Sequence, residues 1–122
     1  MKIALISDLH SNRPALEAVF ADIESQGVTR IGCLGDIIGY GPEPEWCIDQ
    51  VMERCEWSIM GNHDEALFAG ASDFNSYARS AMTYTRKRLK PRWYRGAAPK
   101  KRWSWLRGLP TSHREDRFLF VH

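Results

Sequence analysis

Short apolar runs separated by polar turns give the first half of the chain a regular pattern. Residues 2–7, 28–34 and 56–60 are such runs, and their length is typical of strands buried in a sheet. Residues 45–54 predict a helix after the second run. After the first run, four apolar residues recur at the spacing of an amphipathic helix: Leu16, Val19, Phe20 and Ile23. The resulting β-α-β-α-β order favours an α/β fold with a largely parallel sheet.

The second half of the chain is predicted to be helical, with a strand at its end. Residues 99–108 suggest a short helix, and residues 117–121 a final buried strand that runs into His122. His113 stands alone in a polar segment and is interpreted as a surface turn residue. A longer helical face ends before Pro91 and comprises Phe74, Tyr77, Ala78, Ala81, Met82, Thr85 and Leu89.

Composition narrows the class of protein. The chain has 122 residues and is 43% hydrophobic, which suits one compact globular domain over residues 1–122. The N-terminal apolar run is too short for a signal peptide or a membrane span. The three cysteines are odd in number and show no CxxC spacing, which argues for free thiols and against a disulfide framework or a zinc ribbon. We therefore expect a cytoplasmic protein without a membrane partner.

Charge is divided unevenly along the chain. Residues 1–78 carry a net charge of −9, and residues 79–117 a net charge of +11. The basic stretch 84–108 also contains Trp93, Trp103 and Trp105, a composition that suits binding to a nucleic-acid backbone and its bases. The favoured alternative is that the charges lie on solvated helix faces while the tryptophans pack inside. A positive rim that steers an anionic substrate is a third interpretation.

Polar side chains follow every predicted strand. Asp8 and His10 come after the first, Asp36 after the second, and His122 after the last. The tetrapeptide 61–64, Gly-Asn-His-Asp, follows the third. Because ligands gather outside the carboxyl ends of strands in open α/β sheets, we expect these side chains to meet at one edge. Carboxylate, amide and imidazole groups are metal ligands, so the pattern predicts a metal site.

The spacing adds detail to this prediction. Asp8 and His10 are two residues apart, so an extended backbone would point both to the same side. Asp36 has two oxygens and could bridge two metal ions roughly 3.5–4 Å apart. Each motif alone has an ordinary interpretation as a turn, a helix cap or a polar loop. Their joint occurrence, each after a strand, favours the metal site.

These segments resemble the calcineurin-like metallophosphoesterases. The resemblance rests on SDLHSN, LGDIIGYGP, MGNHD and FVH, and the glycine-rich form of the second motif is similar to the compact prokaryotic branch. It implies a β-sandwich flanked by helices. In that family the chain continues past the position of His122 to a G-H-x-H segment and a second sheet. We therefore expect residues 1–122 to form the N-terminal portion of a domain truncated at its C-terminal side.

The resemblance also implies roles for individual residues. Asp8 and His10 would bind a first metal ion, Asp36 both ions, and Asn62 and His122 the second ion. Manganese is expected first, with iron, zinc, nickel and magnesium as alternatives. A hydroxide bridging the metals would attack the phosphorus of a phosphomonoester or phosphodiester.

Two further residues complete the implied site. His63, with Asn62, would contact the substrate, and His63 would act as the general acid. Asp64 would either orient His63 or cap the following helix. Gly39 and Tyr40 replace an Asp and an Arg of the eukaryotic-type phosphatases, which argues against a phosphoprotein phosphatase.

Other classes of function stay open at this point. The chain could be a metal- or phosphate-binding module without turnover, or a nucleic-acid-binding protein that uses residues 84–108. Because a second sheet is missing from the pattern, we also expect an uncovered apolar face, including residues 118–121, that favours self-association.

Overall fold

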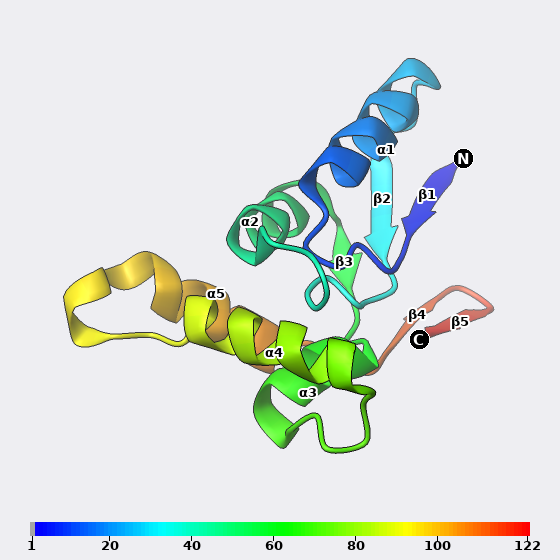
Figure 1. The fold of residues 1–122 in the computed structure, drawn as a ribbon. Helices are drawn as coiled ribbons and strands as arrows, with labels where there is room; N and C mark the ends of the chain where they lie inside the picture. The colour runs from blue at the N-terminus through cyan, green and yellow to red at the C-terminus, as the bar shows by residue number, and fades with distance from the viewer. Residues whose placement is uncertain (1) are drawn as a thin grey trace.

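A parallel three-stranded sheet in the order β1-β2-β3 forms the centre of the computed structural model, which describes residues 2–122 (Figure 1). Ile6 pairs with Cys33 and Cys33 with Ser58, so the carboxyl ends of the strands meet at one edge. The predicted β-α-β-α-β order is thus confirmed, with strands shorter than the apolar runs. Its elements are β1 (Ile3–Ile6), α1 (Arg13–Ser25), β2 (Arg30–Cys33), α2 (Pro44–Arg54) and β3 (Trp57–Ser58).

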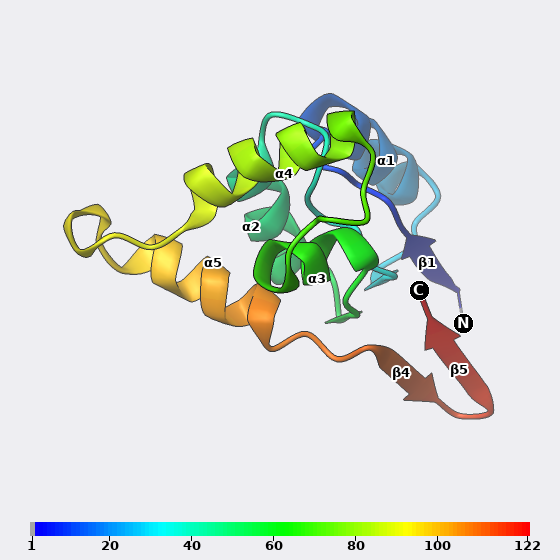
Figure 2. The ribbon, with the colours of Figure 1, turned by 60° about the horizontal axis from the view of Figure 1, so that its bottom comes forward.

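The rest of the described chain is a set of helices followed by a hairpin (Figure 2). The predicted helices at 74–89 and 99–108 are confirmed with small shifts of their ends. Within residues 2–122, no helix is both long and apolar enough to cross a bilayer. The elements are α3 (Asn62–Ala69), α4 (Ser76–Leu89), the 3-10 turn η1 (Trp93–Arg95), α5 (Ala97–Arg107), β4 (Ser112–Glu115) and β5 (Phe118–Val121).

Two expectations about the end of the chain are wrong. The last strand is not buried, because β5 pairs with β4 in a separate antiparallel sheet. Phe118, Leu119 and Val121 are each more than half exposed, which agrees with the separate expectation of an uncovered apolar face that includes residues 118–121. His113 does not lie in a turn but within β4, where it pairs with Phe120.

The core lies between the sheet and its helices. On α1 the predicted apolar face is buried at Leu16, Phe20 and Ile23, whereas Val19 is 40% exposed. Each buried aliphatic or aromatic side chain of this size stabilises the fold by about 1.5–3 kcal/mol. The first strand is less buried than its apolar run suggests: Leu5 is 46% exposed, since β1 lies at the edge of the sheet.

The cysteines are free thiols, as expected from their number and spacing. Burial raises the pKa of Cys33, Cys47 and Cys55 to about 12 in each case. The thiols therefore stay protonated at neutral pH and behave as small core side chains.

Aromatic stacking fastens the hairpin to the sheet. The ring of Trp57 lies 4.2 Å from that of His113, nearly parallel to it, and 4.9 Å from that of Phe120. An ion pair between Arg30 and Glu115 adds a second contact between β2 and β4. These contacts return the last residue of the chain to the carboxyl edge of the sheet.

Helices α4 and α5 form an arm whose tip lies far from the two ends of the chain (Figures 1 and 2). Trp103 and Trp105 are partly buried and pack against the core, as the favoured interpretation of the basic stretch expected. Trp93 differs: it is 90% exposed at the tip, next to Tyr94, which is 63% exposed.

A buried carboxylate connects the loop after β2 to the start of α3. Asp64 is fully buried and accepts hydrogen bonds from the backbone N–H groups of Asp36 (2.8 Å), Ile37 (3.0 Å), Ile38 (3.2 Å) and Gly61 (2.9 Å). Only the bond from Gly61 caps α3, whereas the other three attach the loop after β2, and none of the four involves the ring of His63. Burial raises the pKa of the Asp64 carboxyl to about 6 against the opposing effect of these donors, which leaves it ionised at neutral pH.

Asp64→Asn should destabilise the fold by roughly 3 kcal/mol. The amide keeps the shape of the side chain but replaces an acceptor oxygen with an NH₂ group, which leaves buried backbone N–H donors without partners. Urea unfolding monitored by circular dichroism measures the loss. Asp73→Asn, at an exposed position, is the matched control and should change stability by less than about 0.5 kcal/mol. Equal stability of the two variants would contradict the role given to Asp64.

Candidate metal centre

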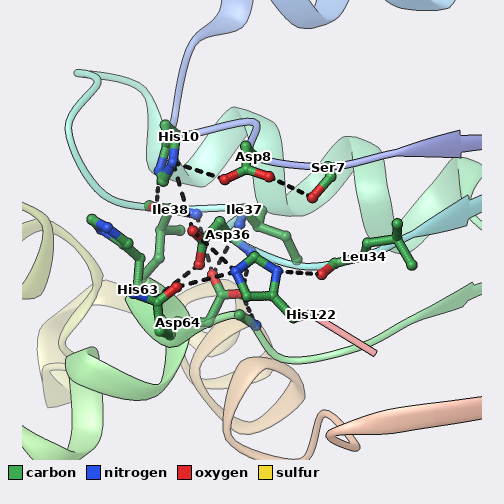
Figure 3. A network of polar contacts seen from close by, with 12 residues as sticks. Ser7, Asp8, His10, Leu34, Asp36, Ile37, Ile38, His63, Asp64 and His122 are labelled. Atoms are coloured by element: carbon green, nitrogen blue, oxygen red, sulfur yellow. Dashed lines mark hydrogen bonds and ion pairs between the residues drawn. The ribbon is translucent and has the colours of Figure 1, made fainter. Parts of the chain in front are cut away.

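The carboxyl edge of the sheet gathers the side chains predicted from the strand ends (Figure 3). Two groups of three residues have ligand atoms within 4.8 Å of one another. One consists of Asp8, Asp36 and His122, and the other of His10, Asp36 and His63. Asp36 belongs to both groups and is only 3% exposed. The expected convergence of these residues at one edge is therefore present in the structure.

His122 reaches this edge from the hairpin. Its Nδ1 lies 2.7 Å from the carbonyl oxygen of Leu34, which can only accept a hydrogen bond, so in the neutral imidazole Nδ1 carries the proton. The bare Nε2 then faces the amide oxygen of Asn62 at 3.1 Å and a carboxylate oxygen of Asp36 at 3.3 Å. Three atoms with free electron pairs therefore point at one another with no proton between them. A cation bound among them would use these atoms as its ligands.

His10 has the same arrangement. Its Nδ1 lies 3.1 Å from the carbonyl oxygen of Ile38, and its Nε2 lies 3.5 Å from a carboxylate oxygen of Asp8 and 3.7 Å from one of Asp36. In both histidines a backbone carbonyl fixes the ring, and Nε2 is left for a ligand. The residues present thus fit divalent ions that accept mixed oxygen and nitrogen ligands.

The start of α3 approaches Asp36 closely. The backbone N–H of His63 donates to Asp36 Oδ1 at 2.9 Å. A Cβ atom at Gly61 would overlap the same carboxylate oxygen, so only glycine fits there. This contact holds Asp36 beside Asn62, the first residue of the helix.

His63 lies among aromatic rings beside the cluster. Its ring centroid is 4.7 Å from that of His10, 4.9 Å from that of Tyr40 and 4.6 Å from that of Phe74. Within residues 2–122, its Nδ1 has no hydrogen-bond partner. Burial lowers the pKa of the imidazole. A Cβ at Gly39 would lie 2.6 Å from Nδ1, so the glycine at this position makes room for the ring.

The backbone around the cluster differs from the prediction. Asp8 and His10 are not extended: their φ angles are 58° and 48°, in the left-handed region. Asp36 (55°), Ser11 (56°) and Tyr40 (57°) share this conformation. Each such residue costs on the order of 1–3 kcal/mol, and the surrounding structure must offset it.

Hydrogen bonds between the loops after β1 and β2 provide part of that compensation. The N–H groups of Asp8, His10 and Ser11 donate to the carbonyl oxygens of Gly35, Asp36 and Ile37 at 2.9–3.0 Å. A hydrogen bond from Ser7 lowers the pKa of the Asp8 carboxyl and keeps it ionised. The two loops therefore present their carboxylates and imidazoles in fixed positions.

Some residues that contact the site could not be predicted to do so from the sequence. The carbonyl oxygens of Leu34 and Ile38 orient the histidines through the backbone, which every residue type offers. Tyr40 and Phe74 contact His63 although they are 23 residues before it and 11 after it. Tyr40 could have been suspected from its place in the glycine-rich loop, whereas Phe74 was expected only as part of a helical face.

Comparisons with known proteins identify the family and the fold of the chain. The family model for calcineurin-like phosphoesterases matches residues 1–122. An uncharacterised protein of Methanocaldococcus jannaschii is 43% identical over 90 residues, which cover 72% of this chain and 37% of that protein. The crystal structure of a metallophosphoesterase from Sphaerobacter thermophilus has a TM-score of 0.76 at 35% identity, over 98% of this chain and 45% of that one.

A more distant structure shares the fold alone. It is a provisionally assigned diadenosine tetraphosphatase, with a TM-score of 0.63 at 18% identity, matched over 90% of this chain and 43% of that one. The chain spans less than half the length of each of these three relatives. Because the family model matches from the first residue to the last, the chain belongs to the calcineurin-like phosphoesterase family.

Proposed function

We propose that this chain provides the catalytic edge of a metal-dependent phosphoesterase with two divalent ions. The observation that carries the proposal is Asp36, a buried carboxylate whose Oδ2 lies 3.7 Å from Nε2 of His10 and 3.3 Å from Nε2 of His122. Asp8 and His10 would hold one ion, Asn62 and His122 the other, and Asp36 both. Manganese suits this mixed set of oxygen and nitrogen ligands. Divalent ions bound there supply positive charge against the phosphate oxygens and acidify a water molecule for attack.

The residues of the protein would contribute to catalysis by positioning the ligands and by transferring a proton. The hydrogen bonds between the two loops hold the backbone of Asp8, His10 and Asp36 in place, so little reorganisation is needed when a phosphoester arrives. His63 belongs to the group with His10 and Asp36, and its ring centroid lies 4.7 Å from that of His10, next to the place where a phosphate would bind. In this position the imidazole can contact the phosphate and give a proton to the leaving oxygen.

Asp36→Asn should weaken the binding of Mn²⁺ at least roughly 100-fold. The substitution removes the negative charge that both groups share, whereas the side chain keeps its size. Calorimetric titration of the apo chain with Mn²⁺ measures the affinity. Asp22→Asn, at an exposed position of α1, should leave the affinity unchanged. If Asp36→Asn bound the metal as the parent chain does, Asp36 would not be a ligand.

His63→Ala should lower the turnover of a chromogenic phosphodiester by roughly 10²–10⁴-fold, the usual contribution of a general acid. Its metal content should hardly change, because the proposal does not make His63 a ligand. His113→Phe is a matched control: it removes a histidine outside the site and retains a ring for stacking on Trp57. Joint loss of metal and turnover in His63→Ala would show that the residue has been given the wrong role.

A second candidate function concerns the tip of the arm. Residues 86–107 contain ten Lys and Arg and no Asp or Glu. Arg88 pairs with Glu45 and Arg102 with Asp49, so part of this charge fastens the arm to α2. At the tip, Trp93 is 90% exposed and directly follows Arg92. An exposed aromatic ring among cations suits single-stranded nucleic acid, through stacking and phosphate contacts.

Trp93→Ala should therefore weaken the binding of a fluorescent oligothymidylate roughly tenfold, the loss expected for one stacked base. Fluorescence anisotropy at low salt gives the affinity, which should fall as salt is raised. Tyr77→Ala removes an equally accessible aromatic ring outside residues 86–107 and serves as control. Binding to anionic vesicles but not to the oligonucleotide would contradict this second function.

A further inference from the structure

A cleft opens beside the candidate metal centre. It has a volume of about 620 Å³ and lies between the start of α1 and the loop at Tyr40, Gly41 and Pro42. Asp8 and His10 form part of its wall, so the cleft is continuous with the ligand groups. A volume of this order suits a small organic group and not a macromolecule.

The lining of the cleft is mostly apolar, with Ser7 and Asn12 as polar members besides Asp8 and His10. Apart from the metal-centre residues, its wall includes Pro14, Ala15, Val19 and Pro42. None of the described residues that line it is Lys or Arg. Arg13 directly precedes the lining residue Pro14, but its guanidinium is engaged elsewhere. It pairs with Glu17 at 2.6 Å and lies 3.6 Å from Glu43. A second phosphate or a carboxylate in the cleft would therefore meet no positive partner.

Tyr40 lines the cleft together with Asp8 and His10 of the metal centre. Its ring packs edge-on against that of His10, with centroids 5.0 Å apart, and also contacts the ring of His63. The side chain nevertheless remains 50% exposed. Its φ of 57° is unusual for a bulky residue, and such a conformation is typical of sites where function requires it.

We propose that this cleft receives the leaving group of the phosphoester and selects an uncharged aromatic one, such as a nucleoside or an aryl alcohol, against the ring of Tyr40. This inference rests on the proposed phosphoesterase function. The metal centre fixes the phosphate at one end of the cleft. The leaving group then extends along the wall formed by Val19, which explains an exposed valine on the otherwise buried face of α1. Tyr40 is a specificity residue, since an aromatic pair contributes about 0.5–1.5 kcal/mol beyond area burial.

Two phosphonates that cannot be hydrolysed test the inference without turnover. Benzylphosphonate and methylphosphonate carry the same anionic head, and only the first has a ring. The Mn²⁺-loaded chain should bind benzylphosphonate roughly tenfold more tightly by calorimetry, the ratio that corresponds to about 1.4 kcal/mol. Tyr40→Ala should bring this ratio close to one with unchanged Mn²⁺ affinity, and Tyr40→Phe should retain the preference. Tyr94→Ala, at the distant tip of the arm, should behave as the parent chain.

Val19→Asp provides a second variant from the opposite wall. Because Val19 is partly exposed, the fold should tolerate the change, and a carboxylate against the ring should weaken the binding of benzylphosphonate more than that of methylphosphonate. Equal binding of the two phosphonates by the parent chain would overturn the inference and leave the phosphoesterase proposal standing, as would an undiminished preference in Tyr40→Ala or Val19→Asp. If neither phosphonate bound to the Mn²⁺-loaded chain, the phosphoesterase proposal would fall, and the inference with it.

Discussion

The carboxylate of Asp64 is the constraint on which the rest of the site depends. It is a buried charge, and a buried charge is costly unless hydrogen bonds compensate for its lost hydration. The compensation comes from four backbone N–H groups on two segments, residues 36–38 and Gly61. The loop after β2 and the start of α3 can satisfy this one carboxylate only when they lie together. Asp36 and Asn62 are brought side by side as a consequence.

The position of Asp36 in turn organises the loop after β1. His10 donates its backbone N–H to the carbonyl of Asp36 and directs its ring at the carboxylate of the same residue. The left-handed conformations of Asp8, His10 and Asp36 are stable because these bonds over-determine the backbone. The strained backbone is therefore also the well-ordered part of the two loops. The side chains of Asp8, His10 and Asp36 consequently have little freedom to rearrange.

The sheet, its flanking helices and the identity of the clustered residues could be predicted from the sequence. The patterns that reveal them lie within short stretches of the chain. Apolar runs mark strands, and polar residues directly after them mark the carboxyl edge. The local geometry at Asp8 and His10 was predicted wrongly, since the left-handed backbone follows from hydrogen bonds to a loop 26 or 27 residues away. The hairpin was missed for a related reason: Ser112–Glu115 is polar, and it forms a strand by pairing with Phe118–Val121 and stacking on Trp57. The exposure of Trp93 likewise depends on how far the arm extends from the core.

The hairpin divides the candidate site into parts of unequal stability. Asp8, His10, Asp36 and Asn62 come from the cross-bonded loops, whereas His122 arrives on a hairpin held by Trp57, by one ion pair and by the carbonyl of Leu34, 88 residues earlier. Such a hairpin can separate from the sheet in a sub-global opening that leaves the core folded. Amide protons of β4 and β5 would then exchange with solvent faster than those of β2. An ion held by Asn62 and His122 would lose its imidazole ligand at each such opening, whereas an ion held by Asp8 and His10 would keep its own.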